Sequence, residues 1–374
     1  MRIMFGDLRI GDITKQYIHR ALNKNWVSEG ANVKEFEQKF ANKFGYKYAI
    51  ATSSGTDADI VSCASLYDFG AKRGDEIIVP ALSFASTANS ILAAGFIPKF
   101  VDVEVETLNI DPAKIEASVT NKTKAIMVVH TMGKPCEMDA ILEIAKAHDL
   151  KIIEDSCEAH GARYKGRFVG NIGDMGTFSF YVAHIVVCGE GGMIVTNNDE
   201  IAKVVQSVKS HGRPVKSIYF DFQRIGFNSR MNELTAAVGL ESIEHFDEAC
   251  DKRKKNLYKL LELTEKLSDY CYFIKEESFE KVSPHAFPLV LKEGKNDRDR
   301  LYNYLESKSI QCKTLFGSLP TQHDAFKFLG YEYGQFPASE YVGKNGLHFG
   351  IHQYLNDDDL LYIKDVLEGY FRVK

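Results

Sequence analysis

The sequence predicts an α/β protein with a mainly parallel sheet covered by helices, followed by a smaller α+β domain. Two observations indicate this fold class. Along the first half of the chain, short apolar runs alternate with helical patterns, which is typical of the units that build a parallel sheet. Later, a charge-rich helical pattern separates that half from a second, smaller group of strands and helices.

The first half begins with two helices, expected over residues 12–24 and 33–44 because apolar residues recur there at helical spacing. Strand and helix patterns then alternate. The expected strands are 48–51, 76–79, 97–101, 125–130, 151–154, 176–181 and 192–196, and the helices among them are 57–67, 86–94 and 139–148.

The second half contains one long helical pattern, over about residues 231–267, which we expect to link the two domains. A strand over 286–291 and a helix over 298–308 follow it. The sequence therefore predicts a large domain over residues 1–240 and a small C-terminal domain over residues 241–374.

Composition excludes several classes of protein. The 46 basic and 51 acidic residues give a net charge of -5, with no basic stripe that would bind nucleic acid. No apolar run approaches the ~20 residues needed to cross a membrane, and the N-terminus lacks the pattern of a signal peptide. The seven cysteines are scattered without CxC or CxxC pairs, which argues against disulfides and zinc. We expect a cytoplasmic protein.

A small polar motif, Thr52-Ser-Ser-Gly55-Thr56, follows an expected strand and opens an expected helix. The exposed N–H groups and the positive end of such a helix suit a phosphate group. Small polar residues at a helix start are also common as simple caps. The motif alone leaves both interpretations open.

The apolar strand Ile152-Ile-Glu-Asp155 ends in two acids. A carboxylate buried at a strand end is costly unless it meets a cation. The protonated nitrogen of a pyridine ring is such a partner, and the charge pair strengthens the ring as an electron sink. The alternative is that Asp155 caps a following helix.

Several ordered motifs together resemble the StrS/DegT-type sugar aminotransferases, which use pyridoxal phosphate (PLP). They start at Trp26-Val-Ser-Glu-Gly30, continue through Gly55-Thr56 and Ser179, and reach Phe336-Pro337, so the resemblance spans most of the chain. It implies an aspartate-aminotransferase-like fold (PLP fold type I). It also implies PLP, or its amine form pyridoxamine phosphate (PMP), as the cofactor.

The resemblance also assigns cofactor contacts to individual residues. Gly55, Thr56 and Ser179 correspond to positions that contact the cofactor phosphate. Asp155 corresponds to the partner of the pyridine nitrogen. Phe84 takes the position of the aromatic side chain that stacks on the cofactor ring, although a phenylalanine in such a run is more often part of a core.

Two further positions extend the implied site. Glu158 stands where glutamine is common, near the phenolic oxygen of the cofactor. Asn228 matches an asparagine that reaches the cofactor phosphate of the neighbouring subunit, which implies an obligate homodimer with shared active sites. On its own, Asn228 in a glycine-containing loop would be a turn residue.

His184 marks a departure from the aminotransferases. In that family a lysine five residues after the serine bonds covalently to the cofactor, but five residues after Ser179 this chain has His184, and no lysine lies between Lys165 and Lys203. An imidazole can move a proton near neutral pH but cannot form that bond. The substitution therefore favours elimination over amino transfer.

This pattern resembles a small branch of the family, the sugar 3-dehydratases of dideoxysugar biosynthesis. One kind holds an iron–sulfur cluster with cysteines that include a close pair. Because this chain has no such pair, we expect the colitose-pathway kind, without a cluster or a metal site. The resemblance implies a nucleotide-linked 4-keto-6-deoxyhexose as substrate, glutamate as amino donor and loss of the C3 hydroxyl.

In this interpretation His184 is the base that takes a proton from the cofactor, and with a pKa near its ordinary value it could also protonate the leaving hydroxyl. Two alternatives stay open. One is a sugar aminotransferase that dispenses with the lysine. The other is a cofactor-binding protein without catalysis, in which His184 is a core residue, because fold does not fix function.

Four other polar residues lie near motif positions. His130 and His160 are as compatible with strand-end hydrogen bonding and packing as with substrate contact. Lys313 and His323 are candidates to meet a phosphate of the substrate.

Overall fold

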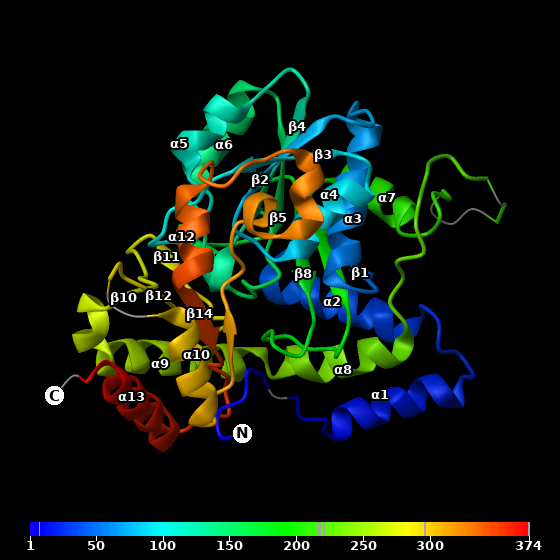
Figure 1. Cartoon of the computed structure of the whole chain (residues 1–374). Coiled ribbons are helices and arrows are strands. Elements are labelled where there is room, and N and C mark those ends of the chain that lie inside the picture. The colour runs from blue at the N-terminus through cyan, green and yellow to red at the C-terminus, as the bar shows by residue number, and fades with distance from the viewer. Residues whose placement is uncertain (7, 215–217, 220, 295–296, 373–374) are drawn as a thin grey trace.

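The computed structural model describes the chain except residues 7, 215–217, 220, 295–296 and 373–374 (Figure 1). Its helices are α1 (Asp12–Asn23), α2 (Ala31–Phe44), α3 (Gly55–Ser65), α4 (Ala85–Ala93), α5 (Pro112–Ile115), α6 (Met138–Ala147), α7 (Asp199–Val208), α8 (Glu233–Glu244), α9 (Phe246–Leu263), α10 (Arg298–Ser307), α11 (Leu319–Gln322), α12 (Pro337–Asn345) and α13 (Asp357–Phe371). Its strands are β1 (Tyr48–Thr52), β2 (Glu76–Pro80), β3 (Ile97–Val101), β4 (Thr123–Val129), β5 (Lys151–Asp155), β6 (Arg163–Tyr164), β7 (Arg167–Phe168), β8 (Met175–Ser179), β9 (Gly192–Thr196), β10 (Cys271–Phe273), β11 (Glu280–Lys281), β12 (Phe287–Leu291), β13 (Cys312–Thr314) and β14 (Gly346–Phe349).

Seven strands form the central sheet in the order β1-β9-β8-β5-β4-β2-β3. The pairs β2/β3, β2/β4, β4/β5 and β5/β8 are parallel. Only β9 is reversed in this sheet, since it is antiparallel to both β8 and β1. Every other strand of the sheet therefore ends at the same edge. The expected mainly parallel sheet is confirmed.

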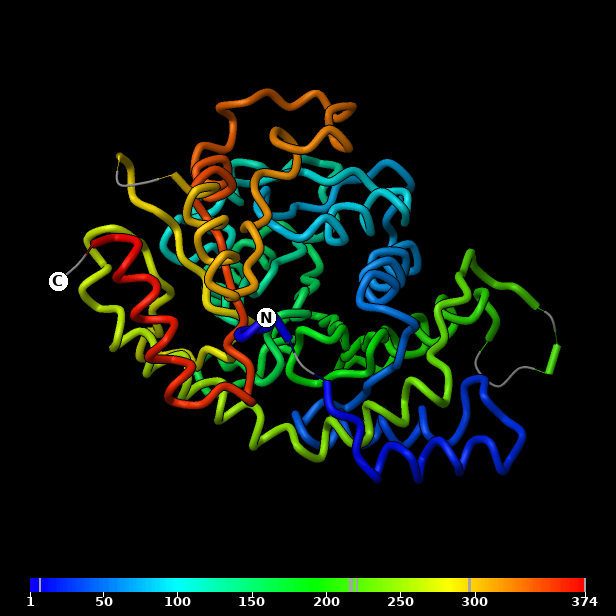
Figure 2. The backbone as a smooth tube through the Cα atoms, turned by 60° about the horizontal axis from the view of Figure 1, so that its bottom comes forward, coloured from blue at the N-terminus to red at the C-terminus, as the bar shows by residue number. Residues whose placement is uncertain are grey.

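Helices cover both faces of this sheet (Figures 1 and 2). Side chains that alternate along the strands create two apolar faces. On one face, residues such as Ile77 and Met127 pack against α3, α4 and α7. On the other face, Ile126 and Ile152 pack against α5 and α6, while α2 and α8 cover β1, β9 and β8. Helices α1 and α2 lie alongside α8.

The long helix expected over residues 231–267 is wrong in one respect, because it is two helices. α8 ends at Glu244 and α9 begins at Phe246. His245 between them has φ -90° and ψ 6°, and its N–H bonds to the carbonyl oxygens of Glu241 and Ile243. The sequence gave no sign of this break, because neither a proline nor a change in the apolar spacing marks His245.

A four-stranded antiparallel sheet, β10-β12-β14-β13, forms a second unit with α9, α10 and α13. The N-terminus also belongs with this unit in space, since Ile3 pairs with Ile310. Asp102, just after β3, accepts hydrogen bonds from the N–H groups of Ala338 and Ser339 at the start of α12. The domain limits at residues 240 and 241 stay a prediction. No helix in the described part of the chain is long and apolar enough to span a membrane.

The Trp26–Gly30 motif has a structural role that involves a buried lysine. Lys209, at the end of α7, donates to Glu29 Oε1 at 2.8 Å and to the carbonyl oxygen of Ala51 at 2.9 Å. Its Nζ also lies 3.5 Å from Glu37 Oε1, and only 5% of its side chain is exposed. This ion cluster joins the segment before α2, α2 itself and α7 around the end of β1.

Replacing Lys209 with methionine should therefore lower the free energy of unfolding by about 3 kcal/mol, because two partly buried carboxylates lose their cation. Urea denaturation measures this change. The matched control is Lys203→Met, on the exposed side of the same helix, which should change stability by less than about 0.5 kcal/mol. Equal effects of the two substitutions would contradict this role of Lys209.

Candidate active site

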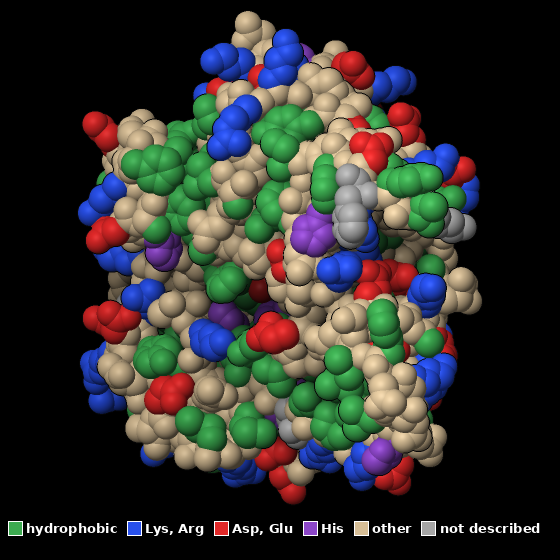
Figure 3. All heavy atoms as spheres, turned by 90° about the vertical axis from the view of Figure 1, so that its right-hand side faces the viewer, with side chains coloured by type: hydrophobic (Ala, Val, Ile, Leu, Met, Phe, Trp, Pro, Cys, Tyr) green, Lys and Arg blue, Asp and Glu red, His purple; other side chains and the backbone are tan. Residues whose placement is uncertain are grey.

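The common edge of the parallel strands gathers the predicted site residues. Gly55 follows β1, Phe84 follows β2, and Asp155 and Ser179 are the last residues of β5 and β8. Because parallel strands bring their carboxyl ends to one edge, residues more than a hundred positions apart become neighbours there. Figure 3 shows a hollow on one face of the molecule, with histidine and acidic side chains inside it.

Gly55 and Ser179 form one side of the site. A Cβ atom on Gly55 would lie 2.6 Å from the Cβ of Ser179, so only glycine lets α3 begin this close to the end of β8. Ser54 caps α3 by accepting a hydrogen bond from the N–H of Asp57. The N–H groups of Gly55 and Thr56 belong to the first turn, where a helix supplies no internal acceptors. The two interpretations of this motif are therefore compatible, because a capped helix start can also bind a phosphate.

Asp155 is 4% exposed at the end of β5. Its carboxylate accepts hydrogen bonds from Thr87 Oγ1 at 2.9 Å and from the N–H of Cys157 at 3.2 Å. Burial raises its pKa, and these hydrogen bonds oppose that rise. The alternative in which Asp155 caps a helix is wrong, because turns and the short strand β6 follow β5 directly.

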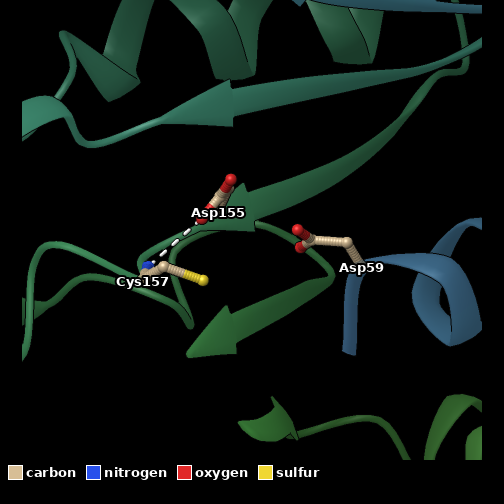
Figure 4. A group of neighbouring side chains, drawn as sticks. All are labelled: Asp59, Asp155 and Cys157. Carbon is tan, nitrogen blue, oxygen red and sulfur yellow. Dashed lines mark hydrogen bonds between the residues drawn. The ribbon is translucent and has the colours of Figure 1, made fainter. Parts of the chain in front are cut away.

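A second buried acid, which sequence reasoning missed, lies beside Asp155. Asp59 is fully buried in the first turns of α3. A side-chain oxygen of Asp59, one of Asp155 and the sulfur of Cys157 all lie within 4.8 Å of one another (Figure 4). The available signal was helical spacing: Asp59 is one turn after Gly55, on the same side of α3.

Glu158 lies in the turn after β5, with 12% of its side chain exposed. Its Oε2 accepts a hydrogen bond from the N–H of Met132 at 2.7 Å, and its Oε1 is 3.8 Å from Nε2 of His285. Burial, together with the negative charge of Asp155, raises the pKa of Glu158 to about 8. At neutral pH this carboxyl group therefore carries a proton that it can donate.

His184 lies in the loop between β8 and β9, and 8% of it is exposed. Its ring is stacked on that of His160, with centroids 5.5 Å apart, and is 4.9 Å from that of His285. The buried Arg253 of α9 holds the loop by donating to the carbonyl oxygens of Ala183 and His184. The structure thus places a histidine cluster at the site.

Burial and the nearby Arg253 guanidinium lower the pKa of His184 to about 3. The expected pKa near the ordinary value is therefore wrong, because sequence alone does not reveal this desolvation. The imidazole is neutral at pH 7, and its buried Nδ1 has no hydrogen-bond partner among the described residues. A neutral imidazole can accept a proton, but at this pKa it is a weak base, and its protonated form is a strong acid.

The two remaining predicted residues differ in exposure. Phe84 precedes α4, and 62% of it is exposed. Its ring meets that of Phe316 edge to face, with centroids 6.0 Å apart. The side-chain oxygen of Asn228 accepts a hydrogen bond from Arg230 at 3.0 Å, and the next residue, Ser229, pairs with Ser53 beside the start of α3.

The four other polar candidates all contact neighbouring groups of the chain. His130 is fully buried between Glu154, at 3.1 Å, and the N–H of Cys136, at 3.0 Å. The ring of His160 packs on His184. Lys313 lies over the ring of Phe5, and His323 contacts the carbonyl oxygen of Phe316 at 2.7 Å. A groove of about 360 Å³ lined by Arg9, His245 and Tyr354, among others, contains none of the predicted site residues.

Comparison with known proteins identifies the family. Residues 9–368 match the DegT/DnrJ/EryC1/StrS aminotransferase family. The chain belongs to this family. The GDP-perosamine synthase of Escherichia coli O157:H7 is 33% identical over 368 residues, which cover 96% of each protein. The GDP-4-keto-6-deoxy-D-mannose 3-dehydratase of Yersinia pseudotuberculosis is 34% identical over 358 residues, which cover 90% of each.

Solved structures agree with this assignment. A mutant GDP-4-keto-6-deoxymannose-3-dehydratase with bound GDP-perosamine superposes with a TM-score of 0.90 at 32% identity, over 98% of this chain and 100% of the other. The same kind of enzyme with a trapped PLP-glutamate geminal diamine has a TM-score of 0.90 at 31% identity, over the same shares. The expected PLP fold type I is thus confirmed. The family and these structures support a PLP/PMP cofactor and a nucleotide-sugar enzyme.

The residues present fit such a cofactor. The start of α3, narrowed by the Gly55–Ser179 contact, offers N–H groups to a phosphate. At the end of β5, Asp155 offers a buried negative charge, and neither Asp155 nor Asp59 forms an ion pair with a lysine or arginine within the described residues. The individual contacts assigned to Gly55, Thr56, Phe84, Asp155, Glu158, Ser179 and Asn228 stay predictions.

The raised pKa of Glu158 makes the stability of the protein depend on pH. Because the fold disfavours the ionised carboxylate, stability relative to Glu158→Gln is lost as pH rises from the ordinary carboxyl pKa, about 4.3, to about 8. Glu158→Gln should therefore leave the cofactor-free protein unchanged near pH 4.5 and stabilise it near pH 8, as thermal denaturation at each pH would measure. Glu332→Gln, on an exposed side chain, is the control. A constant difference across this range would refute the protonated state of Glu158.

Proposed function

We propose that this chain is a PLP/PMP-dependent 3-dehydratase that removes the C3 hydroxyl of a nucleotide-linked 4-keto-6-deoxyhexose. The observation that carries this proposal is the neutral, buried imidazole of His184 in the loop that follows Ser179. In the family that position belongs to a lysine. Two of the relatives are named GDP-4-keto-6-deoxy-D-mannose 3-dehydratase, which supports the same reaction.

The bound cofactor supplies an electron sink and an amine that can combine with the C4 ketone of the sugar. His184 acts as the base that removes the proton whose loss drives elimination. Burial then makes the protonated imidazole strongly acidic, so His184 readily gives the proton to the departing C3 hydroxyl, which leaves as water. The same ring thus serves first as base and then as acid.

The neighbouring residues of the chain keep this proton transfer in place. Asp155 holds a negative charge toward the ring nitrogen, and Glu158, protonated at neutral pH, offers a hydrogen bond to the phenolic oxygen. Arg253 fixes the backbone of His184 from α9. His160 and His285 flank the ring, and burial lowers the pKa of both well below the ordinary value, so both rings are neutral at pH 7.

Glutamate is the proposed amino donor, because a related solved enzyme holds a PLP-glutamate adduct. The second candidate is a sugar aminotransferase, since a GDP-perosamine synthase is about as similar as the dehydratases. An aminotransferase needs a group that detaches the amino-sugar product from the cofactor. With His184 in place of the lysine, this position provides no amine for that exchange, so dehydration is favoured.

Mass spectrometry of the product tests this proposal. Purified protein is supplied with PMP, glutamate and a panel of GDP-, CDP-, dTDP- and UDP-linked 4-keto-6-deoxyhexoses. A product that has lost the C3 oxygen, with release of ammonia, is the expected result. His184→Asn should lower this rate by about 10²-fold or more and retain PLP, because asparagine fits the loop but cannot accept the proton.

Two results would contradict the proposal. An amino sugar that keeps its C3 oxygen identifies an aminotransferase, and retention of PLP without turnover of any sugar identifies a cofactor-binding protein without catalysis. Thr321→Ala, which changes a partly buried hydroxyl bonded to Glu340, is a control for general effects of substitution on the rate.

We also propose that the active form is a homodimer in which Asn228 completes the phosphate site of the partner subunit. The segment of Asn228 lies beside the start of its own α3, where Ser229 donates to Asp57 at 3.0 Å. Exposed apolar side chains of the preceding stretch, including Ile218 and Ile225, are 87% and 85% exposed. Such side chains near a functional loop are typical of an interface.

Mixed dimers test the sharing of sites. Asn228→Ala and His184→Asn chains should each be inactive alone. When they are unfolded and refolded together, half of the dimers are mixed and each has one intact site, so about a quarter of the wild-type activity should return. No recovery, with mixed dimers present by native mass spectrometry, would place Asn228 in the site of its own chain.

A further inference from the structure

Asp59 is a buried acid that the proposed mechanism does not use. It lies in α3 on the side that faces β5 and β8, and none of it is exposed. Thr177 Oγ1 donates to its Oδ1 at 2.6 Å, whereas its Oδ2 has no hydrogen-bond partner among the described residues. A buried carboxyl oxygen without a partner is costly, so a function is expected to retain it.

The register of the sheet places Asp155 on the face that α3 covers, where Asp59 lies. Asp155 pairs with Thr177 across β5 and β8, and neighbouring residues of parallel strands project to the same face. Thr177 reaches Asp59 on that face, and Thr87 of α4 reaches Asp155. Figure 4 shows Asp155 at the end of β5 and Asp59 on α3, with the carboxyl group of Asp59 directed toward the strand.

Among the residues that the structure describes, no lysine or arginine forms an ion pair with either acid of this carboxyl pair. Cys63 faces the pair from α3, and Cys157 and Glu158 face it from the turn after β5. His130, from the end of β4, is the ring that acts on Asp155, and it is already bonded to Glu154. Burial, and then the charge of Asp155, raise the pKa of Asp59 well above its usual range. Two buried acids this close cannot both ionise freely.

We propose that Asp59 is a positioning residue that forms, with Asp155, a two-carboxyl site for the protonated ring nitrogen of the cofactor. This inference rests on the proposed cofactor and goes beyond it. Without the cation, the pair keeps one proton, on Asp59. The pair then carries one negative charge. When the cation binds, its positive charge stabilises a second negative charge on the pair and so favours release of the proton from Asp59. Asp155 faces the nitrogen, and Asp59 acts through Asp155.

Coupling between proton release and cofactor binding makes this proposal measurable. If binding of the cofactor promotes loss of a proton from Asp59, affinity for PLP must rise with pH, by about tenfold for each unit by which the bound cofactor lowers the pKa of Asp59. Asp59→Asn keeps the shape of the side chain and can accept the hydrogen bond of Thr177, but it has no proton to lose. Both proteins retain Glu158, so the ratio of their affinities reports Asp59 alone.

The experiment is an absorbance titration of cofactor-free protein with PLP at several pH values. The ratio of wild-type affinity to Asp59→Asn affinity should rise by about threefold or more between about pH 6 and about pH 9. Calorimetry in two buffers should detect proton release that Asp59→Asn lacks. Thr177→Val, which keeps both acids and removes the hydrogen bond that favours the ionised form, should move the rise to higher pH.

The outcomes separate this inference from the proposed function. Parallel affinity profiles of wild type and Asp59→Asn, with PLP bound by both, would overturn the role of Asp59 and leave the cofactor assignment intact. Failure of the wild-type protein to bind PLP at any pH would overturn both. If Asp59→Asn does not fold, an unmoved profile for Thr177→Val would overturn the role of Asp59.

Discussion

A carboxylate buried at the end of a parallel strand is the constraint around which this molecule is arranged. Asp155 is held there by the register of β5 with β4 and β8, and its hydrogen bonds come from neutral groups. Burial of such a charge is stable only with a cation nearby. At this edge the start of α3 at Gly55 and the loop of His184 lie around Asp155, and the proposed cofactor would supply the cation that this carboxylate lacks.

The reversed strand β9 explains how His184 reaches this edge. β8 ends beside Asp155, and because β9 returns antiparallel to it, the connecting loop lies at the carboxyl edge rather than crossing a face. That loop carries His184. Arg253 then ties the loop to α9, the helix that leads into the second sheet. Packing between the two sheets and the position of the base are thus coupled through one buried guanidinium.

The sequence predicted the repeating parts of this structure and missed those that depend on distant residues. The alternation of strands and helices follows from local apolar spacing, so the edge that gathers Asp155 and Ser179 was foreseeable. The ring contacts of His184 with His160 and His285 join three separate segments and leave no local pattern. Asp59 was overlooked because an acid in a helix is usually exposed to solvent, and its burial here depends on contacts with distant strands. The break at His245 was also missed, because only a single residue departs from the helical pattern.

In the proposed elimination, the neighbours of His184 matter as much as its own ring. A histidine in water would keep the proton that it accepts, since its pKa is close to neutral. Here burial lowers the pKa of His184 to about 3, and those of His160 and His285 also fall well below the ordinary value. A proton on any of these three rings is therefore held weakly. In the proposed reaction the departing hydroxyl accepts it.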